Sequence, residues 1–247
     1  MICDIGNTNI TIGLFRDEDL TFRIELPTLE SKRLRTLLKN ILKSENIIPA
    51  QIKASLICSV VPGINREIKR AIRDVIYTPV YVLGNDLSVP IKNLYSRPEQ
   101  VGQDRLVCAY SALKLYGAPV ITVDLGTAVT FDVVSKNKEY LGGIILPGLA
   151  LSLSALHRNT ALLPEIKLAS PIALIGRDTK ASMLSGIAFG FGSMIDGLIA
   201  RLKRELKASP KVIATGGNGY FIKPYCKKID YFEPDLILKG MGKIIKR

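Results

Sequence analysis

The sequence predicts a duplicated α/β fold, made of two similar halves with a cleft between them. One pattern occurs twice, as DIGNTNITIGLF from Asp4 and as DLGTAVTFDVV from Asp124. In each copy an apolar strand ends in an Asp, a glycine-containing turn follows, and a second strand comes after the turn. Each copy opens a set of three strands that helix–strand–helix patterns follow. The sequence shows no repeats of about 20–50 residues, which would indicate a solenoid. We therefore expect the first half at residues 1–118 and the second at residues 119–247.

The bulk composition is that of an ordinary folded, soluble protein. The chain has 247 residues, of which 47% are apolar and 23% charged, and this length allows one large domain or two small ones. The most apolar stretch, residues 143–156, is shorter than the roughly 20 residues that span a bilayer, and Pro147 interrupts it. The N-terminus lacks the basic region of a signal peptide. We expect a cytoplasmic protein without a membrane partner.

The cysteine and histidine content excludes an ordinary zinc site. The four cysteines, Cys3, Cys58, Cys108 and Cys226, are widely spaced among apolar neighbours, and His157 is the only histidine. Such spacing is typical of buried free thiols in a reducing compartment, because zinc sites need clustered Cys and His ligands.

The formal net charge is +12, and residues 201–247 hold 12 Lys and Arg against 4 Asp and Glu, a net of +8. This excess would suit a nucleic acid, an anionic membrane or an anionic substrate. No basic block interleaves with aromatic residues in the sequence. A solvated basic surface is therefore favoured, and a nucleic-acid partner is not expected.

The first half is expected to begin with three strands and to continue as helix, buried strand, helix and short strand. Alternating Val, Ile, Thr and Phe predict the strands, and leucines and isoleucines at helical spacing predict the first helix. The expected ranges are strands at 2–5, 9–15 and 20–26, a helix at 28–46, a strand at 54–61 that Pro62-Gly63 ends, a helix that follows through Ile76 and a strand ending at 83.

The second half is expected to repeat this order after a linking helix. The helix at 99–116 ends at Gly117-Ala118-Pro119, because proline and glycine break helices. The further expected ranges are two strands within 120–134 that join at Gly126, a strand at 140–148, helices from about 149 and at 178–206, a strand at 211–214 and a final helix at 233–246.

The DIGNT turn has the residues of a phosphate-binding loop. Gly6 lets the backbone approach a phosphate, since glycine has no Cβ. Asn7, Thr8 and Thr11 offer short polar side chains, and Asp4 at the strand end can hold Mg²⁺ or a metal-bound water. The alternative interpretation is an ordinary β-hairpin, because Asn and Thr are common in such turns.

The second copy of this turn, at Asp124, Gly126 and Thr127, favours the phosphate-binding interpretation. Two such hairpins that face each other across a cleft form the phosphate-binding device of actin, hexokinase and Hsp70-type ATPases. In the same superfamily a glycine turn such as residues 215–219 contacts the adenosine end of the nucleotide, although glycine pairs also mark ordinary turns. The other common ATP motifs, GxxxxGK[ST] and the kinase-type GxGxxG, are absent from the sequence.

The VGQDR segment supplies a candidate general base at the start of a helix. Asp104 could be purely structural, because a carboxylate in the first helical turn is stabilised by the helix dipole. The functional interpretation makes Asp104 the acceptor of a proton from an attacking hydroxyl, with Arg105 holding an anionic group. Phosphoryl transfer depends mainly on positioning and charge stabilisation, so a single carboxylate can fill this role.

Taken together, the segments of this chain resemble the type III pantothenate kinases, in order and over nearly the whole length. The segments are DIGNTN, PEQVGQDR, VDLGTAVTFDVV, GGIILPG, TALLP, IGRDTKASMLSG and ATGG. The resemblance implies an actin-like (ribonuclease H-like) ATPase fold. It also implies that the protein phosphorylates pantothenate with ATP to give 4′-phosphopantothenate, the first step of coenzyme A biosynthesis.

The resemblance further implies roles for individual residues. Asp104 would be the proton acceptor, Asp124 would hold a monovalent cation (K⁺ or NH₄⁺), and Mg²⁺ would accompany ATP. The protein would form a homodimer. ATP would contact Asp4, Ile5, Gly6, Asn7, Thr8, Asn9, Ile10, Thr11 and Thr127. Pantothenate would contact Tyr95, Gly102, Gln103, Asp104, Arg105 and Thr179.

One departure from the family pattern and two rival functions bear on this interpretation. The stretch before Thr179 commonly reads Gly-x-Asn-Thr in the family, whereas here Asp178 replaces the Asn and adds a negative charge near an anionic substrate. The rivals are a non-enzymatic regulator of transcription, which the +12 charge would suit, and a related kinase for a sugar or acetate. The presence of Asp4, Asp104 and Asp124 favours the enzyme over the regulator.

Overall fold

The computed structural model of the protein describes residues 1–246, and its chain divides into two compact units. The first unit comprises Met1–Ile91, Ser96–Lys114 and the segment that begins at Leu236. The second comprises Lys92–Tyr95 and Leu115–Asp235. The sequence suggests a single crossing after residue 118, but the chain crosses between the units several times.

The return of the C-terminal segment to the first unit has a packing cause. Helix α7 (Leu236–Ile245) contacts β1 (Ile2–Ile5) and β4 (Ser55–Ser59) of that unit. Leu238 lies against Gly13, and Gly242 lies against the ring of Phe15. Because α7 buries its apolar side on this unit, the last helix belongs to it although the helix is distant in sequence.

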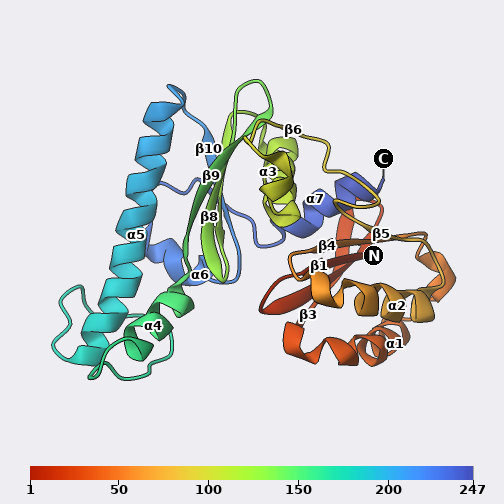
Figure 1. The fold of residues 1–247 in the computed structure, drawn as a ribbon, viewed down its shortest axis with the longest axis horizontal. Coiled ribbons are helices and arrows are strands. Elements are labelled where there is room, and N and C mark those ends of the chain that lie inside the picture. Colours follow the sequence, from red (N-terminus) through yellow and green to blue (C-terminus); the bar gives the residue numbers. More distant parts are fainter. Residues whose placement is uncertain (247) are drawn as a thin grey trace. The chain divides into compact units, whose positions relative to one another are not determined.

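The first unit is built on a five-stranded sheet in the order β3-β2-β1-β4-β5. Strands β1, β2 and β3 form an antiparallel meander, and β4 and β5 run parallel to β1. Helices α1 and α2 lie side by side (Figure 1), and their buried residues join the same apolar core as the strands. The elements wholly or mostly in this unit, besides α7, are β1 (Ile2–Ile5), β2 (Asn9–Arg16), β3 (Asp19–Pro27), η1 (Thr28–Arg33), α1 (Leu34–Ser44), η2 (Pro49–Gln51), β4 (Ser55–Ser59), η3 (Pro62–Ile64), α2 (Asn65–Ile76), β5 (Val80–Val82), η4 (Pro98–Gln100) and α3 (Gln103–Tyr116).

The second unit is built on a six-stranded sheet in the order β11-β10-β7-β8-β9-β6. Here β7, β8 and β9 form the antiparallel meander, and β10 and β11 run parallel to β7. The elements are β6 (Lys92–Asn93), β7 (Val120–Leu125), β8 (Ala128–Val134), β9 (Glu139–Pro147), α4 (Leu149–Arg158), α5 (Thr179–Glu205), β10 (Lys211–Thr215), α6 (Gly219–Ile222), η5 (Lys223–Tyr225) and β11 (Tyr231–Phe232).

The two sheets confirm the predicted duplication. Apart from the added edge strand β6, the second sheet repeats the first. In each sheet the first strand of the meander also pairs with a parallel strand, and that strand pairs with a second parallel strand. Asp4 and Asp124 occupy the same place in the two sheets. Their strand partners on the two sides are Thr11 and Cys58 for Asp4, and Thr130 and Thr215 for Asp124.

The predicted helices and strands are found, with shifts at several ends. The helix expected from residue 28 begins as the 3-10 helix η1, and the one expected from residue 99 begins as α3 only at Gln103. Val101 has extended backbone angles (φ −80°, ψ 123°), which separate η4 from α3. The last helix begins at Leu236 rather than at residue 233. Strands β6 and β11 escaped prediction because each is only two residues long.

Helix α5 is long and apolar enough to cross a membrane, by length and composition alone. Core helices of globular proteins pass the same test. The side of α5 that carries Met183, Ile187, Ile195 and Ile199 is buried in the apolar core of the second unit. Packing in that core is therefore a sufficient reason for its apolar composition.

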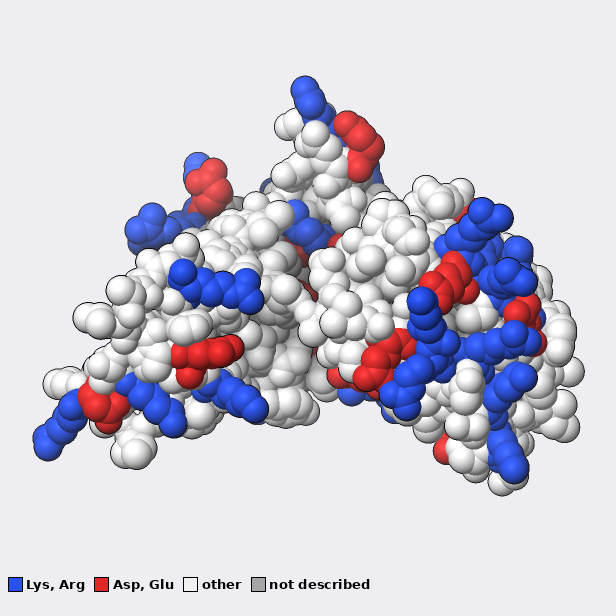
Figure 2. Space-filling model, turned by 60° about the horizontal axis from the view of Figure 1, so that its bottom comes forward, with Lys and Arg blue, Asp and Glu red and all other residues white. Residues whose placement is uncertain are grey.

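Basic side chains gather on the outer face of α1 and α2, as Figure 2 shows. Three of them form ion pairs there: Arg33 with Glu30, Arg35 with Asp74 at 3.5 Å, and Lys69 with Asp86 at 2.9 Å. The sequence placed the excess of charge in the last 47 residues, and this face is a second concentration. The Lys and Arg residues of η1, α1 and α2 are Lys32, Arg33, Arg35, Lys39, Lys43, Arg66, Lys69, Arg70 and Arg73.

Candidate active site

The first hairpin turn is held to the start of η1 by main-chain and side-chain hydrogen bonds. The Gly6 N–H donates to the Asn9 carbonyl (2.9 Å), which closes the turn. The Thr28 N–H donates to the Thr8 carbonyl (2.9 Å), and the Thr28 hydroxyl donates to the Gly6 carbonyl (2.8 Å). The turn is therefore fixed in place, while Asn7, Thr8 and Asn9 are exposed. An anchored turn with exposed polar residues can bind an anion without a large loss of entropy.

Two of the residues expected to contact ATP are inaccessible to a ligand, which corrects the expectation for them. Ile5 and Ile10 are fully buried, with 0% exposure, and belong to the core of the first unit. Asp4 and Thr11, which pair across β1 and β2, are partly exposed. The polar part of the segment therefore consists of Asp4, Thr11 and the turn between them.

Asp4 and Asp104 both lie near Cys58, at the edge of the sheet where three parallel strands end. Strands β1, β4 and β5 are parallel, so their carboxyl ends share one edge, and ligands of open α/β sheets bind outside such an edge. Burial raises the pKa of the Cys58 thiol well above its usual range, and the carboxylates of Asp4 and Asp104 add to the rise. Both predicted acidic residues therefore lie close enough to Cys58 for their charges to act on its thiol.

Asp104 is a partly buried carboxylate in the first turn of α3. Burial raises the pKa of its carboxyl above the ordinary value, and this effect outweighs the opposing backbone hydrogen bond from Arg105 and the Arg105 charge. A side chain at position 102 would overlap Oδ1 of Asp104, so only glycine leaves room for the carboxylate to turn back over the start of α3. A carboxylate with a raised pKa at a ligand-binding edge is typical of a functional group.

The remaining residues expected to bind pantothenate fall in both units. Gln103 and Arg105 flank Asp104 in the first turn of α3. Tyr95 belongs to the second unit, where its N–H donates to Asn93 Oδ1 (2.9 Å) and its ring lies against Gly142. Thr179 is the first residue of α5 and also belongs to the second unit.

Asp124 in the second hairpin is enclosed by main chain from the glycine turn. Gly216 has a φ of +90°, and a side chain there would overlap Asp124 Oδ1 and the Leu125 backbone. The Asn218 N–H donates to the Leu125 carbonyl (3.0 Å), and its side-chain amide donates to the Gly126 carbonyl (3.4 Å). The glycine turn is therefore required for packing against this hairpin, and its contact with the adenosine end of a nucleotide stays a prediction.

Thr127 is held by the segment that ends β9. Its carbonyl accepts a hydrogen bond from the Gly148 N–H (3.1 Å), and a side chain at position 148 would overlap the same carbonyl. Thr127 itself is exposed. The GGIILPG motif thus supports the second turn directly, a role that its sequence did not reveal.

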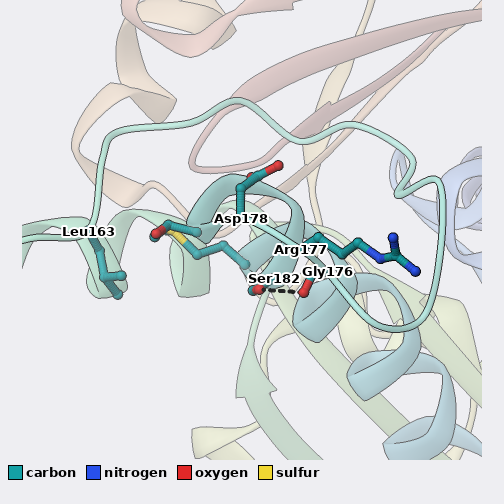
Figure 3. A pocket seen from close by; sticks show the side chains of 7 residues that line it. Leu163, Gly176, Arg177, Asp178 and Ser182 are labelled. Atoms are coloured by element: carbon teal, nitrogen blue, oxygen red, sulfur yellow. Dashed lines mark hydrogen bonds between the residues drawn. The ribbon is translucent and has the colours of Figure 1, made fainter.

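The start of α5 lines a cavity of about 590 Å³ in the second unit, shown in Figure 3. Asp178 is the N-cap of α5, and its Oδ1 accepts from the Ala181 N–H (2.8 Å). An N-terminal helix dipole stabilises a negative charge, and Asp and Asn cap helices about equally well. Asp178 therefore keeps the capping role of the usual Asn. The lining residues are Leu163, Gly176, Arg177, Asp178, Thr179, Ser182 and Met183.

The residues present fit a hard cation rather than zinc. Within residues 1–246, no group of three or more His, Cys, Asp or Glu side chains could hold a metal ion. Carboxylate and carbonyl oxygens suit K⁺ and Mg²⁺, whereas zinc prefers Cys and His. Asp124 offers a carboxylate oxygen at the place where Gly216 leaves out a side chain. A cation would be held there by Asp124 with main-chain or substrate oxygens.

The likeness to solved structures shows the fold. A conserved Baf family protein from Campylobacter jejuni, described provisionally as a transcriptional activator, is 22% identical, with a TM-score of 0.61 over 99% of this chain and 96% of that chain. A protein from Sinorhizobium meliloti, described provisionally as a 2-dehydro-3-deoxygalactonokinase, is 13% identical, with a TM-score of 0.60 over 99% and 97%. The chain has the duplicated actin-like fold of ATPases and sugar kinases.

The family follows from sequence comparison. The family model for type III pantothenate kinase matches residues 1–201. A type III pantothenate kinase from Finegoldia magna is 39% identical over 98% of this chain and 94% of that protein. The chain therefore belongs to the type III pantothenate kinase family.

Proposed function

We propose that this protein transfers the γ-phosphoryl group of ATP to the primary hydroxyl of pantothenate, with Asp104 as the proton acceptor. The products are ADP and 4′-phosphopantothenate, so the reaction is the first step of coenzyme A biosynthesis. One observation carries the role of Asp104: its carboxyl is partly buried, has a raised pKa and lies with Asp4 around Cys58. Membership of the kinase family supports the reaction.

Asp104 accepts the proton of the hydroxyl as its oxygen attacks the γ-phosphorus. A new oxygen–phosphorus bond forms, the bond between the γ-phosphorus and the bridging oxygen breaks, and ADP leaves. A carboxylate whose pKa is raised by burial is a stronger base than an exposed Asp, and this is why its environment favours the role. The positive charge of Arg105 then binds the carboxylate of pantothenate.

ATP is bound in this proposal by Asp4, by the turn residues 6–9, by Thr11 and by Thr127. The anchored first turn offers the side chains of Asn7 and Thr8, whereas Ile5 and Ile10 are fully buried in the core of the first unit. Backbone N–H groups of a tight turn form a concave site for anions. Pantothenate is bound by Tyr95, Gly102, Gln103, Asp104, Arg105 and Thr179.

Two cations belong to the proposal. Asp124 would hold K⁺ or NH₄⁺, and Mg²⁺ would accompany ATP, with Asp4 as the carboxylate that would hold it directly or through a water. Bound there, the cations supply positive charge that offsets the charge of the phosphates during transfer. Oxygen donors without Cys or His support this choice of ions.

A homodimer in the cytoplasm completes the proposal. Large apolar side chains are exposed on α4 and on the segment before α5, including Ile172 at 105% and Leu162 at 90% relative exposure. Exposed apolar groups on one unit suggest a surface that a second copy covers. The further members of this set are Leu151, Leu156, Leu174 and Ile175.

The test is ADP release from ATP and Mg²⁺ with pantothenate, a hexose or acetate as the acceptor, in K⁺, NH₄⁺ or Na⁺. We expect release that requires pantothenate and K⁺ or NH₄⁺. Release with the hexose or acetate alone would identify a different kinase. No release with any acceptor, together with salt-sensitive binding of a DNA duplex, would favour the regulator, for which the basic face of α1 and α2 would supply the contacts.

A further inference from the structure

A short loop after β5, residues 83–87, is closed on itself by hydrogen bonds. The Gly84 N–H donates to the Leu87 carbonyl (2.8 Å), and the N–H groups of Asn85 and Asp86 donate to the Val82 carbonyl (3.2 and 2.8 Å). The loop follows the carboxyl end of β5, at the edge where Asp4 and Cys58 also lie. Its shape is therefore fixed by local bonds rather than by solvent.

An ion pair from α2 braces this loop. Oδ2 of Asp86 accepts a hydrogen bond from the Val82 N–H (2.9 Å) and pairs with Nζ of Lys69 (2.9 Å). The hydrogen bonds from Lys69 and Val82 lower the pKa of the Asp86 carboxyl below its ordinary value. Asp86 therefore stays ionised at neutral pH, and the loop stays attached to α2.

The side chain of Gln103 lies directly against Gly84. A Cβ at position 84 would lie 3.1 Å from Cδ and 3.3 Å from Nε2 of Gln103, closer than side chains ordinarily approach. Gly84 also has a φ of +84°, a conformation that favours glycine. Position 84 therefore favours glycine for two reasons, the nearby side chain of Gln103 and the positive φ. Only the first involves Gln103.

We propose that Gly84 is a positioning residue for the pantothenate-binding turn. The braced loop forms a rigid seat against which Gln103 packs, and that contact sets the position of the first turn of α3, including Gln103 and the adjacent Asp104. The inference rests on the proposed function, in which Gln103 contacts pantothenate. Lys69, Asp86 and Gly84 act through Gln103 and touch no substrate themselves.

The consequence is a specific change in substrate binding. In Gly84→Ala, Gln103 has to shift by a few tenths of an ångström, because the methyl group takes the space where its amide lies. Misplacement of a substrate-positioning group by about 1 Å can cost about 100-fold, so a smaller shift should cost roughly tenfold. We expect the KM for pantothenate to rise about tenfold while the KM for ATP changes less than about twofold.

Gly117→Ala is a matched control for backbone strain. Gly117 has the same φ of +84°, and a Cβ at this position would meet no other group within 4 Å. Both variants therefore carry the strain of alanine in a left-handed conformation, and they differ in the contact with Gln103. We expect both to melt at lower temperature, and Gly84→Ala alone to raise the KM for pantothenate.

A direct readout of Gln103 tests the position without relying on turnover. The side-chain amide signals of Gln103 in a ¹⁵N-correlated NMR spectrum can be assigned by their loss in Gln103→Glu. We expect these signals to shift in Gly84→Ala and in the brace variant Asp86→Asn, and to stay in place in Gly117→Ala. The brace variant also provides the test if Gly84→Ala fails to fold.

Each result has a defined meaning. Unmoved Gln103 signals in both Gly84→Ala and Asp86→Asn would overturn the inference, as would equal KM values for pantothenate in Gly84→Ala and Gly117→Ala. If the wild-type protein shows no turnover with pantothenate, the proposed function fails while the NMR signals still decide whether Gly84 positions Gln103. If turnover is present and the signals move without any change in KM, the function stands and the positioning role is wrong.

Discussion

The two hairpins share one sequence design and one place in their sheets, but they are enclosed by different material. A side-chain donor bonds the glycine carbonyl in both turns, Thr28 for Gly6 and Asn218 for Gly126. Asp4 has the Cys58 thiol beside it on the next strand. The carboxylate of Asp124 lies against the main chain of Gly216 instead. The first unit also holds Asp104, so its hairpin has a second carboxylate nearby.

This difference shows how the two copies within a duplicated fold can take different roles. The backbone beside Asp124 tolerates little change, since a side chain on Gly216 would overlap both a carboxylate and a carbonyl carbon. A carboxylate against rigid backbone suits a bound cation, and an edge where burial raises the pKa of Asp104 suits proton transfer.

The largest expected effects come from removing the two equivalent carboxylates one at a time. Asp4→Asn and Asp124→Asn should each lower kcat about 100- to 1,000-fold, because each removes charge that organises the phosphates. Only Asp124→Asn should abolish the preference for K⁺ over Na⁺. Steady-state ADP release in each salt measures both. Loss of the cation preference in Asp4→Asn instead would assign the monovalent cation to the first hairpin.

Glycine replacements should separate the two kinds of enclosure by their effect on stability. Gly216→Ala should lower the free energy of unfolding by about 2–4 kcal/mol, since it adds steric overlap to a strained φ. Gly6→Ala should cost less than about 1.5 kcal/mol, because its Cβ would meet only the Asn9 carbonyl, at 3.2 Å. Urea unfolding of both variants provides the comparison. Equal losses would mean that the two turns are equally constrained.

The raised pKa of Asp104 makes the stability of the first unit depend on pH in a defined direction. The folded chain binds the Asp104 proton at a higher pH than the unfolded chain. Stability therefore falls as pH rises from the ordinary Asp pKa to the raised folded value, and this contribution is level above it. Asp104→Asn should melt at a higher temperature than the wild type at pH 7, and the gain should shrink in acid. A variant less stable than the wild type at pH 7 would contradict the dominance of burial.

The smallest effect concerns the side-chain bond that anchors the first turn. Thr28→Val removes the hydroxyl that donates to the Gly6 carbonyl and preserves the shape of the side chain. It should lower the free energy of unfolding by about 1 kcal/mol and raise the KM for ATP, while Thr21→Val serves as a control on the neighbouring strand. An unchanged KM for ATP would show that the turn keeps its position without this bond.

The sequence was sufficient to predict the duplicated fold, because the strand–Asp–Gly–strand pattern is local and occurs twice. It also placed Asp178 at the start of a helix, where the structure shows an N-cap. It misplaced the domain membership of the last helix, whose packing on β1 and β4 depends on contacts across the whole length of the chain. Periodicity identifies a helix but not the unit on which it packs.

The supporting contacts of the candidate site could not be predicted for the same reason. From the sequence, Gly216 belongs to a glycine turn that either contacts the adenosine end of a nucleotide or is an ordinary turn, and Gly84 has no distinguishing feature, although each lies against a candidate site residue. These contacts join segments that are far apart in sequence, and they are made because a glycine lacks a side chain. A single sequence shows a missing side chain without showing what fills the space. The clearest signal in the sequence was the repeated Asp residue of the two hairpins. Its equivalent places in the two sheets confirm the duplicated fold.

The role of Asp104 as proton acceptor is tested most sharply by pantothenate-dependent ADP release from the wild type and Asp104→Asn at saturating ATP, pantothenate and K⁺, followed as a function of pH. We expect kcat of the wild type to fall in acid around a pKa above the ordinary value for Asp. We expect kcat of Asp104→Asn to be lower than that of the wild type by about 100-fold or more at every pH above this pKa. Folded Asp104→Asn protein with wild-type kcat and an unchanged acid limb would contradict this role.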